Sequence, residues 1–288
     1  METLRALPPA DLAAVRASGQ LDDLLLTDLE HGPRHGFVAV AERDAAGALV
    51  GYAQASCGNS GFVLGAVVWP SAGGRDDTRQ RLLAALLAEL PSETAVTWWT
   101  HGADDGSTVA AALGLRADRR LLQLRRPLPL PPETAAAGEV PLRSFVVGAD
   151  EAAWLEVNNA AFAWHGEQGG WDLATLQQRE LEPWFRPEGF LLHERDGRLA
   201  AFCWTKLHDG GSVGEIYVIA VHPAFHGLGL GRALTVAGLV HLHTAGAVEG
   251  MLYVDADNTA AVALYRALGF EHAHTDQAYV RDPKGTPP

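Results

Sequence analysis

The stretch VHPAFHGLGLGRAL, residues 221–234, is the most informative part of the sequence. Its glycines alternate with other residues from Gly227 to Gly231, and a strand-like apolar run ends just before it. Backbone N–H groups at the start of a helix bind phosphate well, and glycines let the backbone come close to it. The stretch therefore predicts a phosphate-binding loop between a strand over 215–221 and a helix over 232–243.

The glycine spacing separates this loop from two common phosphate-binding motifs. A dinucleotide-binding fingerprint needs G-x-G-x-x-G, whereas residues 227–231 offer only G-x-G-x-G. A P-loop needs a lysine after its last glycine, and no lysine follows here. A plain flexible turn before a helix is the remaining alternative for the loop taken alone.

The chain contains one pattern twice. Residues 37–55 and 189–207 each predict a strand, a polar turn and a second strand, followed by another strand, a glycine-bearing loop and an amphipathic helix. The proline-rich segment between the copies favours a linker. We predict an α/β protein with an N-terminal domain over 1–126, a linker over 127–141 and a C-terminal domain over 142–288. Each domain should be a mixed sheet flanked by helices.

The two copies differ where chemistry would require particular side chains. Phe62 of the first copy aligns with Glu215 of the second. Ala110 likewise aligns with Tyr265, and SAGGRDD over 71–77 replaces the glycine loop. The first copy therefore lacks an acid, a phenol and a regular glycine loop. We predict that the chemistry takes place in the second copy and that the first is catalytically inactive.

Composition narrows the classes of partner. The 288 residues are 48% hydrophobic and carry a net charge of −13, which suits a globular protein without the basic surface of a nucleic-acid binder. No apolar run approaches the ~20 residues that span a membrane, and the N-terminus has no secretory signal pattern. Cys57 and Cys203 both lie in apolar, strand-like stretches, so we expect a reduced, cytoplasmic protein without disulfides.

Two motifs resemble those of the GNAT N-acetyltransferases. The glycine loop is similar to the family's acetyl-CoA loop, R/Q-x-x-G-x-G/A, except that His226 stands where Arg or Gln is usual. DADNTAAVALYRALGF, residues 255–270, resembles a second signature, in which an Asn precedes a helix with a Tyr and then L-G-F. NNAAFAWHGEQGGW, residues 158–171, is similar to the mycothiol synthases, a family of tandem GNAT enzymes. That family uses acetyl-CoA to acetylate the cysteinyl amine of cysteinyl-glucosaminyl-inositol. The resemblance implies two tandem GNAT domains and a monomer.

The resemblance implies that acetyl-CoA is bound at the glycine loop. Backbone groups at the end of the preceding strand would pair with pantetheine where a bulge separates the strand from its neighbour. Asn258 can bond CoA through its amide, or it can simply cap the helix that follows. The implied cofactor-binding residues are Ile219, Ala220, Val221, His226, Gly227, Leu228, Gly229, Leu230, Gly231, Arg232 and Asn258.

The resemblance also assigns the chemistry to two side chains. Acetyl transfer to an amine needs a group that takes a proton from the ammonium and one that gives a proton to the departing thiolate. Glu215 is the implied general base and a contact of the acceptor, and Tyr265 is the implied general acid. A solvated acid at a strand end and a core aromatic are the respective alternatives. Direct transfer is favoured because Cys203 has no activating His or Lys in the sequence around it.

Further contacts with the acceptor are implied at Glu167, Lys206 and Tyr253. A Glu and a Lys suit a polyhydroxyl molecule as acceptor and donor of hydrogen bonds. An exposed strand-end charge is the alternative for Lys206, and a sheet aromatic is the alternative for Tyr253. An acid of the first copy could also reach the acceptor, best matched at Asp23, with Asp22 beside it.

The histidines predict no metal site, because none is paired with Cys or a carboxylate at zinc-site spacing. Two other functions stay open at this point. One is a tandem GNAT enzyme that acetylates another small amine. The other is a non-catalytic acyl-CoA-binding sensor, which would have no use for a base and an acid at the site.

Overall fold

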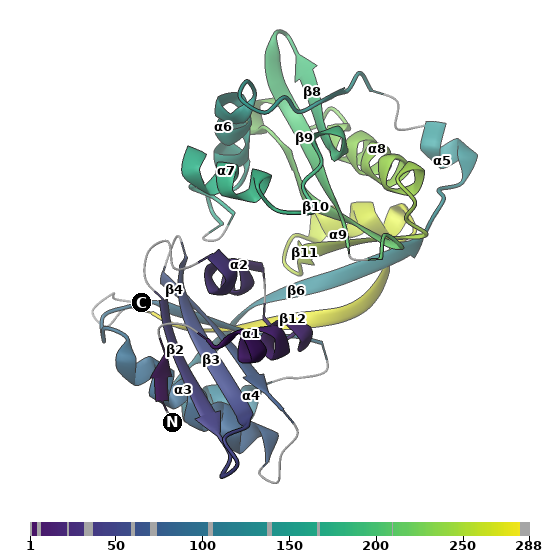
Figure 1. Cartoon of the computed structure of the whole chain (residues 1–288). Helices are drawn as coiled ribbons and strands as arrows, with labels where there is room; N and C mark the ends of the chain where they lie inside the picture. Colours follow the sequence, from purple (N-terminus) through teal and green to yellow (C-terminus); the bar gives the residue numbers. More distant parts are fainter. Residues whose placement is uncertain are drawn as a thin grey trace. The chain divides into compact units, whose positions relative to one another are not determined.

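The computed structural model contains two compact units (Figure 1). The first unit consists of residues 1–121 and 275–288, and the second consists of residues 122–274. Each unit is a β-sheet with helices packed on it, as the sequence predicts. The structure describes residues 2–4, 7–21, 23–31, 37–58, 61–69, 74–102, 106–136, 140–165, 168–208 and 210–282.

The first unit is a mixed sheet flanked by helices. Its described elements are β1 (Glu2–Leu4), α1 (Pro9–Ala17), α2 (Asp23–His31), β2 (Phe37–Arg43), β3 (Leu49–Gly58), β4 (Gly61–Val68), α3 (Arg75–Glu89), β5 (Val96–Thr100), α4 (Ser107–Ala112), the start of β6 (Arg116–Pro127) and the end of β12 (Glu271–Arg281). The strands lie in the order β1-β2-β3-β4-β5-β12. The pairing of β4 with β5 is parallel, and that of β12 with β5 is antiparallel.

The second unit has the same kind of architecture. Its described elements are the end of β6, α5 (Pro132–Ala136), β7 (Arg143–Ser144), α6 (Glu151–Ala161), α7 (Leu173–Glu180), η1 (Pro187–Gly189), β8 (Phe190–Arg195), β9 (Arg198–Leu207), β10 (Val213–Val221), η2 (Pro223–Phe225), α8 (Leu230–Thr244), β11 (Glu249–Asp255), α9 (Thr259–Ala267) and the start of β12. The strands lie in the order β6-β11-β10-β9-β8-β7. β10 is parallel to β11 and antiparallel to β9, which makes this sheet mixed as well.

β9 lies inside the second sheet and is buried on both faces. On one face, α8 packs on an apolar cluster that includes Cys203 and Ile216. On the other, α6 and α7 contribute Trp154 and Leu176 to an aromatic cluster. α8 can approach β9 closely because it carries Gly238 there, and a Cβ at this glycine would lie 2.6 Å from Cys203 Sγ. Close packing on both faces fixes β9, and with it the neighbouring strand β10.

The compact units differ from the predicted domains over 1–126, 127–141 and 142–288. Their boundaries fall inside β6 and β12, so the end of β6 belongs to the second unit and the end of β12 to the first. Strand pairing is the reason, because residues 277–281 of β12 pair with β5. The predicted linker is also not irregular throughout. It contains α5, and Ala135 packs against the core of the second unit.

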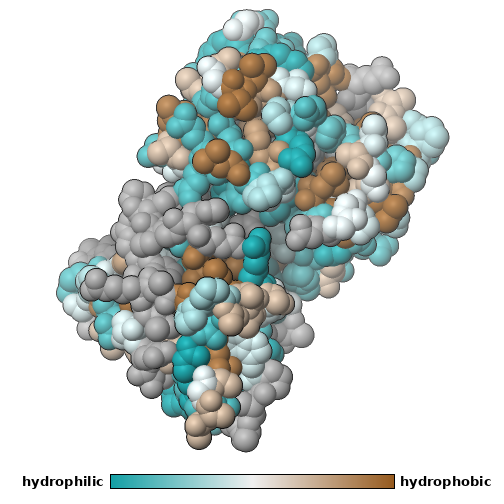
Figure 2. Space-filling model, in the orientation of Figure 1, coloured by the Kyte–Doolittle hydropathy of each residue, from teal (hydrophilic) through white to brown (hydrophobic). Residues whose placement is uncertain are grey.

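The surface of the second unit carries only scattered apolar groups in the view of Figure 2, where brown residues stand in small clusters among hydrophilic ones. Large apolar side chains that are exposed include Trp164, Leu181 and Leu228. Exposed residues of this kind are ordinary on a folded protein. Within the described ranges, no helix is both long and apolar enough to cross a membrane.

Candidate functional site

The site begins where β10 parts from β11. β10 pairs with β11 only from Val213 to Ile216, although it pairs with β9 as far as Val221. The register with β9 shifts between Ile216 and Val218, which leaves Tyr217 as the extra residue of a bulge. A bulge bends its strand and locally disrupts the ladder. The bulge that the family resemblance implies is therefore present, and backbone groups after Ile216 face an opening instead of β11.

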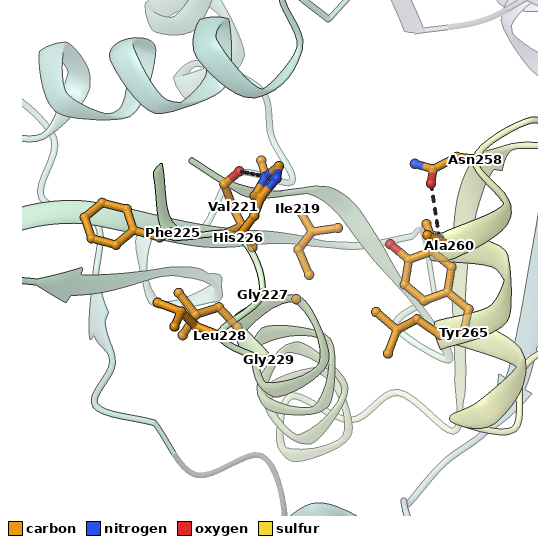
Figure 3. A pocket seen from close by; sticks show the side chains of 15 residues that line it. Ile219, Val221, Phe225, His226, Gly227, Leu228, Gly229, Asn258, Ala260 and Tyr265 are labelled. Carbon is orange, nitrogen blue, oxygen red and sulfur yellow. Dashed lines mark hydrogen bonds between the residues drawn. The ribbon is translucent and has the colours of Figure 1, made fainter. Parts of the chain in front are cut away.

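This opening leads into a pocket of about 370 Å³. The pocket lies between the end of β10, the glycine loop, the first turn of α8 and one face of α9 (Figure 3). It is lined by Ile219, Ala220, Val221, Phe225, His226, Gly227, Leu228, Gly229, Leu230, Gly231, Asn258, Ala260, Ala261, Leu264 and Tyr265. The predicted cofactor-binding residues all line it except Arg232, which follows in the first turn of α8.

Four lining residues were not anticipated from the sequence, namely Phe225, Ala260, Ala261 and Leu264. Helical periodicity could have indicated one of them, because Ala261 lies one turn before Tyr265 on α9. The others carry no chemical signal in the sequence, and only the packing of α9 beside the glycine loop reveals them.

The glycine loop has a backbone that only glycine adopts readily. Gly227 and Gly229 have φ values of 78° and 75°, in the left-handed region. A Cβ at either position would meet nothing within 4 Å, so both face open space. Gly229 is the N-cap of α8 and has no side chain that could cap it, which leaves the first N–H groups of this helix available to a ligand. An anion suits this position best, because the helix dipole is positive there.

His226 has a local structural role in the turn before the glycine loop. Its Nε2 lies 3.0 Å from the carbonyl oxygen of Val221, and Figure 3 shows the ring turned back toward that strand end. The backbone N–H of Ala224 also donates to Nδ1 of His222, at 3.1 Å. Two histidine rings therefore hold the turn between β10 and the glycine loop.

α9 brings two predicted residues to the pocket. Asn258 Oδ1 accepts a hydrogen bond from the N–H of Ala261 at 3.1 Å, which confirms the helix-cap alternative for this residue. Tyr265 is buried, packs edge-on against Phe270, and extends its hydroxyl into the pocket (Figure 3). Burial raises the pKa of the Tyr265 hydroxyl above its ordinary value, and the neighbouring Cys203 raises it further.

Glu215 lies on the face of the sheet opposite to Ile216, which packs under α8. It is 7% exposed, so the predicted alternative of a solvated acid is wrong. Its Oε2 lies 2.9 Å from Nε2 of His208, a residue that sequence reasoning missed. The strand period of two could have indicated it, since His208 is two residues after Lys206.

Lys206 is the direct partner of Glu215 across the β9–β10 ladder. It is only 9% exposed, which contradicts the alternative of an exposed strand-end charge. Its Nζ lies 4.8 Å from the ring centre of Trp184 and 5.5 Å from that of Tyr217. Cation–π contacts of this kind hold the ammonium in place.

The remaining residues that the sequence predicts as acceptor contacts lie only partly within the described structure. Tyr253 is 38% exposed on β11, and its hydroxyl accepts a hydrogen bond from Gln123 Nε2 at 2.7 Å. Asp23 is the first residue of α2, and its side chain lies outside the described structure. Glu167 and Asp22 also lie outside the described residues.

The first unit has the same ladder without these side chains. Phe62 pairs with Cys57 and with Val96, as Glu215 pairs with Lys206 and Met251 in the second unit. The β3–β4 ladder continues from Gly51 to Gly58 without a register shift. The first unit thus carries neither the carboxylate nor the bulge at these positions. Across the residues that the structure describes, there is also no group of three or more His, Cys, Asp or Glu side chains placed to hold a metal ion.

Known proteins resemble the chain in sequence and in fold. Residues 154–270 match the Acetyltransferase (GNAT) family. The mycothiol acetyltransferase of Streptomyces coelicolor is 44% identical to the chain, over 97% of the chain and 94% of the relative. A solved GCN5-related N-acetyltransferase from Sphaerobacter thermophilus has a TM-score of 0.69 and 24% identity, and the match covers 99% of this chain and 97% of that one.

A solved tandem GNAT protein from the clavulanic acid biosynthesis pathway has a TM-score of 0.68 and 17% identity, with 96% of this chain and 94% of that one covered. The predicted tandem GNAT fold is therefore confirmed, and the close sequence relatives show that the protein is an acetyltransferase. The chain belongs to the mycothiol acetyltransferase family of GNAT enzymes.

Proposed function

We propose that the protein is a monomeric, cytoplasmic enzyme that uses acetyl-CoA to acetylate the cysteinyl amine of cysteinyl-glucosaminyl-inositol, giving mycothiol. One observation carries the proposal: a single strand, β10, holds a buried carboxylate at one end and borders the pocket at the other. Relatives named mycothiol acetyltransferase, which match almost the whole chain, favour this acceptor.

The pocket suits the phosphate end of acetyl-CoA. The open N-terminus of α8 offers backbone N–H groups and a positive dipole end to the pyrophosphate. The backbone of β10 from Ile219 to Val221 is available to the amides of pantetheine because β11 pairs with β10 only as far as Ile216. Acetyl-CoA supplies the acetyl group as a co-substrate, and the protein's own part is to hold the thioester where an amine can attack it.

Two side chains would move the protons. Glu215 would take a proton from the acceptor's ammonium, and the neutral amine would then attack the thioester carbonyl. Tyr265 would donate its proton to the CoA thiolate as the C–S bond breaks. Its hydroxyl holds that proton at neutral pH because the ordinary pKa of tyrosine is about 10, and burial raises the pKa of Tyr265 further. Lys206 and Tyr253, on the same face of the sheet as Glu215, would bond the hydroxyl groups of the acceptor.

Direct transfer fits the surroundings of the cysteine in the second unit. Cys203 is completely buried in the core under α8, and burial strongly raises the pKa of its thiol. A thiol in such surroundings is a poor nucleophile, because the thiolate is the reactive form. The acetyl group would therefore pass to the amine without an acetyl-cysteine intermediate.

The test is an assay of acetyl-CoA consumption with cysteinyl-glucosaminyl-inositol, an aminoglycoside, a polyamine and an N-terminal peptide as alternative acceptors. Loss of the thioester absorbance is the suitable signal, because the proposed acceptor carries a thiol of its own. We expect kcat/KM to be at least about 100-fold higher for cysteinyl-glucosaminyl-inositol than for the other amines. A higher value for another amine would show a different acceptor, and tight CoA binding without turnover would show a sensor.

Glu215→Ala tests the proposed base in the same assay. We expect kcat/KM to fall by about 10²- to 10⁴-fold at neutral pH, with much of the loss recovered at high pH, where the amine is already neutral. A variant whose profile of kcat/KM against pH matches that of the wild type would show that Glu215 is not the base.

A further inference from the structure

His208 makes a direct hydrogen bond to the proposed base. Its Nε2 lies 2.9 Å from Oε2 of Glu215. Within the described part of the chain, this is the one side-chain hydrogen bond of Glu215. The carboxylate is nearly buried, with 9% of its side chain exposed, whereas the imidazole is 36% exposed. A buried carboxylate that had no hydrogen-bond donor would be strongly destabilised, so the contact with His208 stabilises the carboxylate of Glu215.

The backbone holds His208 in place for this contact. Its N–H donates to the carbonyl oxygen of Val213 at 3.0 Å, and its own carbonyl accepts from the N–H of Gly211 at 2.9 Å. These bonds close the hairpin between β9 and β10 beside Glu215. The position of the imidazole is therefore determined by the same hairpin that carries the base.

Other charged groups on this face of the sheet have partners elsewhere. Lys206, on β9, holds its ammonium over the rings of Trp184 and Tyr217. Glu249, on β11, forms an ion pair with Arg125 of β6. Among the described groups on this face, His208 is thus the one that forms a hydrogen bond with the carboxylate of Glu215.

We propose that His208 is the positioning residue of the base. Its Nε2–H donates to Oε2 and fixes the carboxylate in one orientation, which leaves Oε1 to receive the proton of the acceptor. In that step the N–H bond of the ammonium breaks, an O–H bond forms at Oε1, and the electron pair remains on the amine nitrogen. This inference rests on the proposed role of Glu215 as the base.

A double-mutant cycle on the full-length protein tests the inference. His208→Leu removes the donor, and we expect kcat for acetyl transfer to fall about 10- to 100-fold, while the KM for acetyl-CoA is unchanged. His208→Gln keeps an N–H donor at similar reach and should stay within about threefold of wild type. In a Glu215→Ala background, His208→Leu should have no further effect, because its only target is gone.

His243→Leu is the matched control. This histidine also belongs to the second unit and also makes one hydrogen bond, from Nδ1 to the carbonyl oxygen of Ala247 at 3.2 Å. It lies in the last turn of α8, and we expect its loss to leave kcat unchanged. His208→Asn, whose amide is too short to reach Oε2, replaces His208→Leu in the cycle if the leucine variant does not fold.

The possible results separate the two proposals. A wild-type kcat in His208→Leu, or an equal loss with and without Glu215, would overturn the positioning role and leave the role of Glu215 intact. A wild-type kcat in Glu215→Ala would overturn the base itself, whatever the His208 variants show. A loss in His208→Leu that is absent from His208→Gln and from the Glu215→Ala background would establish the positioning role.

Discussion

Glu215 and Lys206 are direct partners across the β9–β10 ladder, and both are buried although both are ionisable. The corresponding ladder position of the first unit pairs Phe62 with Cys57. The two units therefore share this strand pairing but not its chemistry. Burial of an acid and a base costs free energy, which a fold tolerates most readily where function needs them. This difference supports the proposal that acetyl transfer belongs to the second unit alone.

Tyr265→Phe should slow the chemical step without disturbing the pocket. The phenyl ring can keep the edge-on contact with Phe270, so we expect the free energy of unfolding to change by less than about 1 kcal/mol. We expect kcat to fall about 10²-fold, because the thiolate loses its proton donor. Steady-state kinetics and denaturant unfolding measure the two quantities. An unchanged kcat would assign Tyr265 to the core only.

The pH dependence of the wild-type enzyme offers a second test of Tyr265. Burial raises the pKa of this hydroxyl, so the phenol stays protonated where an exposed tyrosine, with a pKa of about 10, would ionise. We therefore expect kcat to show no decline on the alkaline side up to about pH 10. A decline well below that pH, absent from Tyr265→Phe, would contradict the protonated state inferred for this residue.

Gly229→Ala should weaken both the fold and the binding of acetyl-CoA. Its φ of 75° disfavours any side chain, so we expect a loss of about 1–2 kcal/mol in the free energy of unfolding. The added methyl group would also occupy open space at a residue that lines the pocket, and we expect the Kd for acetyl-CoA to rise about 10-fold. Calorimetric titration and denaturant unfolding are the measurements.

Gly197→Ala is the control for this substitution. Gly197 has a φ of 73° in the turn between β8 and β9, and a Cβ there also meets nothing within 4 Å. The variant should lose similar stability and keep the wild-type Kd. Equal Kd values for the two variants would show that the glycine loop is not the site of the cofactor.

His226→Ala and His226→Gln should differ in cofactor binding. The ring of His226 bonds the carbonyl oxygen of Val221, and glutamine retains an N–H donor that alanine lacks. The loss of one hydrogen bond at the surface, about 0.5–1.5 kcal/mol, would raise the Kd for acetyl-CoA by about 2- to 13-fold in His226→Ala. His226→Gln should bind within about twofold of wild type. If His226→Ala bound acetyl-CoA with the wild-type Kd, the ring of His226 would not be the group that holds the loop.

Asp150→Asn should reduce stability in a pH-dependent way. Asp150 accepts hydrogen bonds from both terminal nitrogens of Arg143, at 2.6 and 2.8 Å, and from the N–H of Val146 at 2.8 Å. The Arg143 guanidinium lowers the pKa of this carboxyl in the folded protein. The stabilisation is then present above the ordinary aspartate pKa of about 3.9 and disappears as the pH falls through the folded-state value.

We expect Asp150→Asn to cost about 1–3 kcal/mol at pH 7, and the difference from wild type to vanish in strongly acidic solution. Denaturant unfolding at a series of pH values measures this difference. A difference in the free energy of unfolding that stays constant down to the lowest accessible pH would contradict an ionised, hydrogen-bonded pair of Asp150 and Arg143.

The sequence by itself determined the local parts of the site. The glycines at alternate positions, Gly227 and Gly229, predicted backbone with positive φ just before a helix. Asn258 indicated where α9 begins, and helical spacing placed Tyr265 on that helix. These features depend on backbone conformation and capping, which involve only residues close together along the chain. The repeat was visible for the same reason, since each copy follows the same order of strands, turns and helices.

Only the tertiary structure decided which distant residues meet. It brought α9 beside the glycine loop and His208 within hydrogen-bond distance of Glu215. It also placed the ammonium of Lys206 over two aromatic rings and joined the end of β12 to the first unit. The physical reason is that such contacts depend on strand register and on how helices pack against a sheet. Both are set by the balance of burial over the whole unit, which no short pattern contains.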